Sequence, residues 1–325
     1  MNMMHNDDAF ATMLLMSQIT PSREELVRPL SVSEWHALNQ RLHDAGMRGM
    51  GALLNLDMSG FTLRLDIAES EAYRLCVLLS RVLPLTMSLE RFALNGIRVI
   101  TYSERSYPAR LRDRLGVQAP PMLYLSGTPA LFRQDAIAIL GAHNARGDAE
   151  RIVRKLSALA IDAGYAVITD GTTGVARIAE DEAVFSNGRV LEIAAEALLS
   201  RVEQPDMLSM IELGTGSVMS LEHPEAPYTA SHALRRNKCL YAFAQAVFVV
   251  SAEHKKGATF DGACEAMNKK YCDFVYVWDT DLYPGNRPLI ERGATPISVV
   301  TPETFDPMVR AWHRATAKQL SFFDR

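Results

Sequence analysis

The sequence predicts an α/β protein in which a doubly wound, mostly parallel sheet follows a small all-helical N-terminal domain. The first observation is the unbroken apolar run Ala136–Leu140, which is typical of a strand buried on both faces of a parallel sheet. The second is the alternation of such runs with amphipathic stretches after Asp135, because this alternation produces parallel strands joined by right-handed crossovers. The third is the length of 325 residues, which exceeds one typical core and indicates two domains.

Helical spacing dominates the first 100 residues. Residues 1–20 are predicted to be a flexible lead or a short docking helix, and residues 21–100 a helical domain. The first clear helix starts at Ser31 or Ser33, either of which can cap it, and continues through apolar residues at helical spacing. Shorter helices are expected at 52–56, 69–83 and 88–94, with breaks at Gly60, Pro84 and Gly96.

The sheet domain is predicted to span residues 101–300. A short strand at 96–100 and a loop at 101–121 lead into it, and the stretch 196–213 is ambiguous. Strands are expected at 137–140, 166–169, 190–193, 217–221, 247–251, 274–278 and 297–300. Helices are expected at 149–163, 175–185, 230–244, 260–271 and 287–292. Residues 301–325 are expected to form a short C-terminal tail with a helix at 307–318 and no winged helix.

Composition limits the classes of function. The formal net charge of −4 gives no global attraction to nucleic acid or to anionic lipid, so such binding requires local basic patches. The four cysteines are scattered without a C-x-x-C pair, which argues against a zinc site or a disulfide framework. Acidic residues stand where a signal peptide carries basic ones, and no apolar run is long enough to span a membrane. We therefore expect a cytoplasmic protein with no metal and no cofactor.

Motifs for catalysis are absent from the sequence. It contains no G-x-S-x-G elbow, no P-loop and no His/Glu pair at metal-ligand spacing. Gly214–Ser217 resembles only half of a dinucleotide fingerprint.

The turn that follows Ala136–Leu140 is the first candidate site. Gly141 ends the strand, and a helix follows the polar segment that includes His143 and Asn144, so an anion can sit at the helix N-terminus. His143 can act as an anion ligand whose charge depends on pH. Alternatively, it is a neutral histidine that closes the turn by hydrogen bonds.

Basic residues provide a second candidate at the same sheet edge. Arg235, Arg236 and Lys238 flank the start of a helix, where an arginine can fork two phosphate oxygens. Lys256 and Gly257 follow the strand at 247–251, and a glycine there lets a phosphate approach backbone N–H groups. The alternative is that Arg235 and Lys255 are solvated surface charges and that Asn237 caps a turn.

Five segments, in the same order and at matching spacing, resemble motifs of the DprA/Smf DNA-processing family. These are Tyr107–Leu111 with Pro120–Gly127, Ile137–Asn144, Leu234–Lys238, Lys256–Thr259 with Gly262–Ala263, and Gly285–Ala294. The helical domain lies where that family has a sterile-alpha-motif-like or helix-hairpin-helix-like domain.

The resemblance implies a Rossmann-like fold, no catalysis, homodimerisation, and binding of single-stranded DNA that is handed to a recombinase. It also implies that phosphates are bound by residues from the matching motifs. The predicted DNA or phosphate ligands are Gly141, His143, Asn144, Gly171, Arg235, Arg236, Asn237, Lys238, Lys256, Gly257 and Thr259.

The sequence departs from the family pattern at the turn itself. The family's Ser-Arg pair is replaced by Ala142-His143, which removes a permanent charge and its planar donors. A carboxylate enters at Asp170, and the stretch 196–205 is acidic where the family has another motif. Two alternatives therefore stay open. One is a DprA-derived regulator or antitoxin that binds a toxin in a phage-defence module, and the other is a sensor of a nucleotide-derived ligand.

Overall fold

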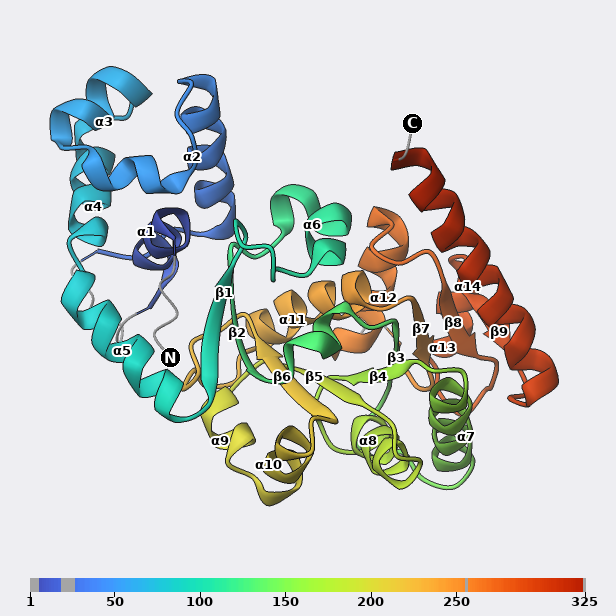
Figure 1. Cartoon of the computed structure of the whole chain (residues 1–325). Coiled ribbons are helices and arrows are strands. Elements are labelled where there is room, and N and C mark those ends of the chain that lie inside the picture. The colour runs from blue at the N-terminus through green and yellow to red at the C-terminus, as the bar shows by residue number, and fades with distance from the viewer. Residues whose placement is uncertain (1–5, 19–26, 255–256, 324–325) are drawn as a thin grey trace. The chain divides into compact units, whose positions relative to one another are not determined.

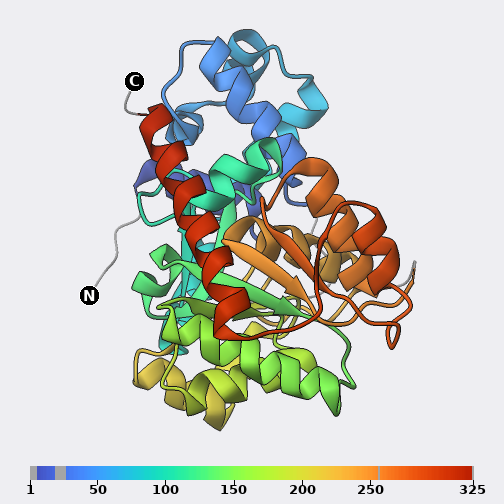
Figure 2. The same cartoon turned by 90° about the vertical axis from the view of Figure 1, so that its right-hand side faces the viewer.

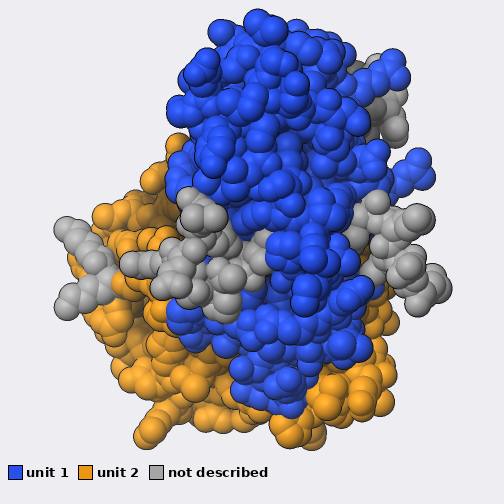
Figure 3. Space-filling model, turned by 90° about the vertical axis from the view of Figure 1, so that its left-hand side faces the viewer, with its two compact units in different colours: residues 1–126, 196–204, 219–227 blue, residues 127–195, 205–218, 228–325 orange. Residues whose placement is uncertain are grey.

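The computed structural model describes residues 6–18, 27–254 and 257–323 and divides them between two compact units (Figure 3). Unit 1 comprises residues 1–126, 196–204 and 219–227, and unit 2 comprises residues 127–195, 205–218 and 228–325. The predicted boundary at residue 100 therefore lies within unit 1. The reason is that the segment after residue 100 pairs and packs with the chain before it.

The N-terminal residues include a buried helix, which agrees with the predicted short docking helix and not with the alternative of a flexible lead. Helix α1 spans Asp7–Met16 and is capped by the Asn6 side chain, which accepts a hydrogen bond from the Ala9 N–H. Its side chains from Ala11 to Leu15 are fully buried, and the Asp8 carboxylate accepts a hydrogen bond from the Gly51 N–H. The apolar stretch is thus part of the core of unit 1.

The helix start near Ser31 is confirmed as α2 (Val32–Asp44), where Ser31 and Glu34 form a capping box. A 3₁₀ helix η1 (Met50–Asn55) and the helices α3 (Met58–Leu65), α4 (Glu69–Leu79) and α5 (Val82–Leu94) follow. The break falls between Leu79 and Val82, not at Pro84 as predicted. Pro84 lies in the first turn of α5, where its missing N–H has no partner to lose.

Strand β1 (Ile97–Thr101) is where the sequence predicts it, and it pairs antiparallel with β2 (Met122–Gly127). The segment between them is not the expected loop. It contains helix α6 (Ala109–Leu115) and a 3₁₀ turn η2 (Gly116–Gln118), and Leu111 and Leu115 of α6 are buried. Two buried leucines one helical turn apart form the apolar face of this helix. The many arginines of the segment make that face hard to recognise from the sequence.

The described strands form one sheet in the order β1-β2-β6-β5-β4-β3-β7-β8-β9, which confirms the doubly wound, mostly parallel architecture (Figure 1). After a 3₁₀ turn η3 (Pro129–Arg133), β3 covers Ala136–Leu140, all buried, and its parallel neighbours are β4 and β7. The other strands are β4 (Ala166–Thr169), β5 (Val190–Ala194), β6 (Gly216–Ser220), β7 (Ala246–Val249), β8 (Val275–Trp278) and β9 (Thr295–Ile297).

Helices of unit 2 cover both faces of these strands (Figure 1). Helices α7 (Asp148–Asp162) and α8 (Val175–Phe185) pack on one face, where Ile137 and Ile139 of β3 join their core. Helices α11 (Ala230–Phe243) and α12 (Gly257–Lys269) lie on the other face. The short helix α13 (Asn286–Glu291) leads to β9, and the ambiguous stretch forms α9 (Leu198–Val202) and α10 (Pro205–Glu212).

The segment 301–325 is not merely a short tail with a helix at 307–318. Helix α14 spans Pro302–Phe323 and runs beside the strands of unit 2 (Figure 2). Phe305 and Trp312 are buried against Phe248 and Tyr276, and the Trp312 indole N–H donates to the Tyr276 hydroxyl at 3.1 Å. These two aromatic side chains make α14 part of the sheet core.

Among the described residues no single helix is long and apolar enough to cross a membrane, and only the bent pair α4 and α5 reaches that length and composition together.

Candidate functional site

The sheet has its topological switch point between β3 and β7. The chain leaves β3 through α7 toward β4 on one side, whereas β7 lies on the other side of β3 and leads through α12 to β8. Crossovers that diverge in this way leave a crevice at the carboxyl ends of the strands, and ligands of doubly wound sheets bind there. The candidate site is therefore built from the turns that follow β3, β4 and β7.

The turn after β3 is fixed by contact with the end of β7. A Cβ atom on Gly141 would lie 2.5 Å from the Ser251 Oγ and 2.6 Å from a methyl carbon of Val175. The Ala142 N–H donates a hydrogen bond to the same Ser251 Oγ at 2.6 Å. Only glycine fits this approach, and the following side chains, His143 and Asn144, are exposed to solvent.

The turn after β4 packs directly on the turn after β3. The Val175 N–H donates to the Ala142 carbonyl at 3.1 Å, and a Cβ atom on Gly174 would overlap that carbonyl and the His143 backbone. Gly171 has a φ of +69° and lies against the buried Glu192 carboxylate. The structure thus brings the predicted residues Gly141, His143, Asn144 and Gly171 to one edge.

Arg236 is buried beneath this edge, with 4% of its surface exposed. Its Nη1 donates to the Asp170 carbonyl at 2.9 Å, its Nη2 lies 3.3 Å from the Asp170 Oδ2, and its Nε donates to the Asn237 Oδ1 at 2.8 Å. The Asn237 Nδ2 donates to the Ala258 carbonyl at 2.6 Å. We call these four residues the Arg236 cluster, which ties the end of β4 and the start of α12 to α11.

The contacts of the Arg236 cluster bear on the prediction that the Arg236 guanidinium binds two phosphate oxygens. The Asp170 carboxylate stands where a phosphate oxygen would meet the guanidinium, and it is itself held by hydrogen bonds from the Thr172 N–H at 3.2 Å and hydroxyl at 2.6 Å. A phosphate ligand of Arg236 must therefore displace Asp170. The sequence shows the carboxylate but not its pairing with an arginine 66 positions away.

The remaining predicted residues that the structure describes lie on α11 and in the first turn of α12. Arg235 is exposed, whereas the Lys238 Nζ forms an ion pair with the Glu265 carboxylate at 3.0 Å. Gly257, the first residue of α12, is exposed with a φ of +83°. The Thr259 carbonyl accepts a hydrogen bond of 3.5 Å from the Tyr241 hydroxyl, and burial raises the pKa of that hydroxyl so that it stays protonated. Lys255 and Lys256 lie outside the described residues.

The helix N-termini at this edge differ in their charge. Helix α7 carries Asp148 and Glu150 in its first turn, and these carboxylates oppose a bound anion at that terminus. The first turn of α12 carries no acidic residue within its described range. The positive end of the α12 dipole is therefore the better place for an anion. In the described part of the chain, no group of three or more His, Cys, Asp or Glu side chains could hold a metal ion.

Solved structures with the same fold include two DNA processing proteins. DNA processing protein A from Streptococcus pneumoniae superposes with a TM-score of 0.58 and 15% identity, covering 83% of this chain and 95% of that chain. DNA processing protein A from Helicobacter pylori, described by its single-stranded DNA binding mode, superposes with a TM-score of 0.54 and 18% identity, covering 66% and 96%. No functionally curated protein matches the chain significantly.

The family itself is shown by the sequence match. A family model for DNA recombination-mediator protein A matches residues 98–305, which include every strand of the sheet except the first residue of β1. This range covers well over half of the chain and all of the turns described above. The chain therefore belongs to the family of DNA recombination-mediator protein A, the DprA proteins.

Proposed function

We propose that this protein is a non-enzymatic DNA-processing protein that binds single-stranded DNA through its backbone phosphates and thereby supports recombination. The observation that carries the proposal is the family match across the whole sheet domain, and a solved member of that family is described as binding single-stranded DNA. The net charge of −4 means that attraction of DNA must be local.

Local attraction is available at the carboxyl edge of the sheet. The exposed His143 and Asn144 side chains offer hydrogen-bond donors, and the N-terminus of α12 at Gly257 offers backbone N–H groups and the helix dipole. Contacts of this kind recognise phosphates and not base edges. The proposal therefore predicts binding with little dependence on DNA sequence.

The test is fluorescence anisotropy of a labelled single-stranded oligonucleotide, titrated with the full chain across a series of salt concentrations. The logarithm of affinity should fall with the logarithm of salt concentration by about 0.7 per phosphate contacted. His143→Ala should weaken binding by about fivefold, as expected for the loss of about 1 kcal/mol. The matched control is His43→Ala, because His43 is also exposed but lies on α2 of unit 1. Absence of binding at low salt, or equal affinities of the two variants, would refute the proposal.

The role of Arg236 is settled by the same assay on Asp170→Asn. If a phosphate replaces the Asp170 carboxylate, removal of the competing charge should raise the affinity for single-stranded DNA. An unchanged affinity would assign Arg236 to the internal structure of the site and leave His143 and α12 as the phosphate contacts.

Homodimerisation and a protein partner, whether recombinase or toxin, stay predictions. So does the nucleotide-sensor alternative, for which a thermal-shift screen with nucleotides is the direct measurement, because a ligand stabilises the folded state by RT ln(1 + [L]/Kd).

A further inference from the structure

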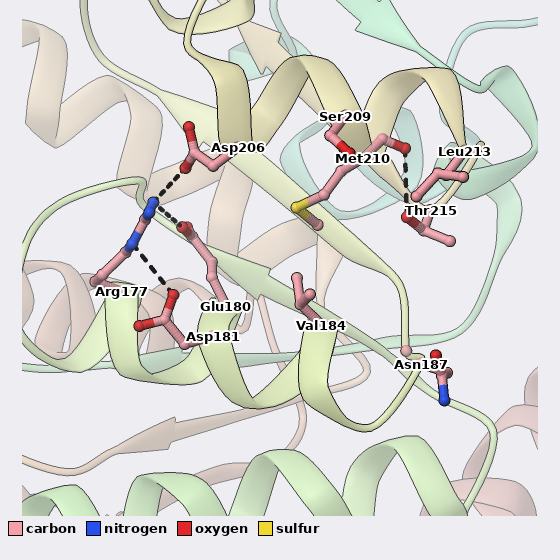
Figure 4. Close-up of a pocket in the computed structure, with 11 residues that line it drawn as sticks. Arg177, Glu180, Asp181, Val184, Asn187, Asp206, Ser209, Met210, Leu213 and Thr215 are labelled. Atoms are coloured by element: carbon pink, nitrogen blue, oxygen red, sulfur yellow. Dashed lines mark hydrogen bonds and ion pairs between the residues drawn. The ribbon is translucent and has the colours of Figure 1, made fainter.

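A groove of about 430 Å³ lies between α8 and α10, within unit 2 (Figure 4). It is lined by side chains one helical turn apart on each helix, namely Arg177, Asp181 and Val184 from α8, and Asp206, Met210 and Leu213 from α10 and its end. Figure 4 shows Val184 and Met210 pointing toward one another across the groove. We call this feature the α8–α10 groove.

The apolar part of the α8–α10 groove is open to solvent. Val184 is 51% exposed, Leu213 is 75% exposed, and Phe185, next to Val184 at the end of α8, is 82% exposed. Met210, in contrast, is 7% exposed and forms the floor. Large apolar side chains gathered beside a hollow, and not scattered singly, are typical of a surface that another molecule covers.

The other end of the α8–α10 groove is acidic. Arg177 Nε lies 3.3 Å from the Asp181 carboxylate, and Arg177 Nη1 lies 2.5 Å from Asp206 and 3.7 Å from Glu180. Asp181 therefore shares the guanidinium of Arg177 with two other carboxylates. The Asp181 side chain is 53% exposed and presents negative charge to solvent at this end of the groove. A DNA strand would be repelled here, whereas a cationic side chain would be attracted.

The distance between the acidic and apolar ends suits a helix. From Arg177 to Val184 the lining of α8 extends about 10 Å, which is two helical turns. A bound helix with apolar residues at positions i, i+4 and i+7 would place these against the apolar part of the groove. Lys or Arg on the flanking turn of that helix would then lie at the acidic end. We propose that the α8–α10 groove binds a basic amphipathic helix of a partner protein, at a surface separate from the DNA-binding edge.

The test uses the full chain and a fluorescein-labelled amphipathic helical peptide built from Leu and Lys, with a second peptide in which Glu replaces every Lys. The basic peptide should bind, more weakly at elevated salt, and the acidic peptide should not. The double variant Val184→Ser, Leu213→Ser should weaken binding by about tenfold, because it removes two anchors on the wall of the groove. Both positions are largely exposed, so the variant should fold as the wild type does.

The matched control is Leu208→Ser, since Leu208 is a 43% exposed leucine of α10 that does not line the groove. This variant should bind the basic peptide as the wild type does. Equal binding of both peptides, or unchanged binding by the double variant, would overturn the proposal. So would a concentration-dependent increase in mass in sedimentation that the double variant abolishes, because a second copy would then occupy the groove. The double variant should retain the affinity of the wild type for single-stranded DNA, so the two proposals fail independently.

Discussion

Removal of the Arg236 guanidinium should destabilise unit 2 out of proportion to the loss of one arginine. Arg236→Ala deletes three contacts and leaves the Asp170 side chain, which is only 15% exposed, without its cation. Breaking a buried ion pair costs about 3–5 kcal/mol. Asp170 keeps two hydrogen bonds from Thr172, and we therefore expect a loss of about 2–4 kcal/mol in the free energy of unfolding. Urea denaturation followed by circular dichroism, with the m-value compared between variants, measures this loss.

The control is Arg133→Ala, the same substitution at an exposed position of η3 in unit 2, which should change the free energy of unfolding by less than about 0.5 kcal/mol. A double-mutant cycle with Asp170→Ala should give a coupling energy above about 1.5 kcal/mol. Equal stabilities of the two arginine variants, or a coupling energy near zero, would show that the Arg236 cluster does not hold the edge together.

Two further predictions concern the turn after β3 and the helical unit. Gly141→Ala should destabilise the fold by about 1–3 kcal/mol, because its Cβ meets Ser251 and Val175, and it should cost more than Gly147→Ala, which has a φ of +61° but open space around it; equal thermal midpoints would contradict this. The pKa of the Glu34 carboxyl lies well below its ordinary value, chiefly because Arg28 donates a hydrogen bond to the carboxylate. Burial acts in the opposite direction, and a hydrogen bond from Arg74 lowers the pKa further. This carboxylate therefore stabilises unit 1 above pH about 4.5, and the contribution is lost as the pH falls. Glu34→Gln should flatten the acid limb of a pH–stability curve for unit 1, whereas an unchanged limb would exclude this role.

Local signals in the sequence predict much of the fold. The run Ala136–Leu140 is a buried strand because a strand covered on both faces needs no polar alternation. The helix cap at Ser31 is equally local, since the hydroxyl and Glu34 are three residues apart. Helix α6 was not predicted because arginines surround its two buried leucines. A short helix near the N-terminus was predicted only as one of two alternatives, because its apolar stretch is short and its burial depends on distant helices.

The chemistry of the candidate site depends on contacts that no local pattern contains. The sequence places Arg236 at a helix start near a sheet edge, which favours a phosphate ligand. Whether that guanidinium faces solvent or Asp170 is decided by the packing of α11 on the strands. The requirement for glycine at position 141 is likewise not visible locally. It arises because a Cβ atom there would overlap the side chain of Ser251, more than 100 positions later. One wall of the α8–α10 groove, helix α10, lies in the stretch whose elements the sequence left ambiguous, whereas α8 lies where the sequence predicts it.

The discontinuous composition of the two units has a consequence for synthesis of the chain on the ribosome. Unit 1 includes residues 219–227, so a nascent chain that has emerged only as far as residue 126 lacks part of it. Unit 2 buries Trp312 of α14 against Tyr276, so its core stays incomplete until nearly the whole sequence has emerged. Domains that are continuous in sequence fold one after another from the N-terminus. Here unit 1 should instead reach its final packing only after residue 227 has emerged, and unit 2 only after Trp312 has emerged.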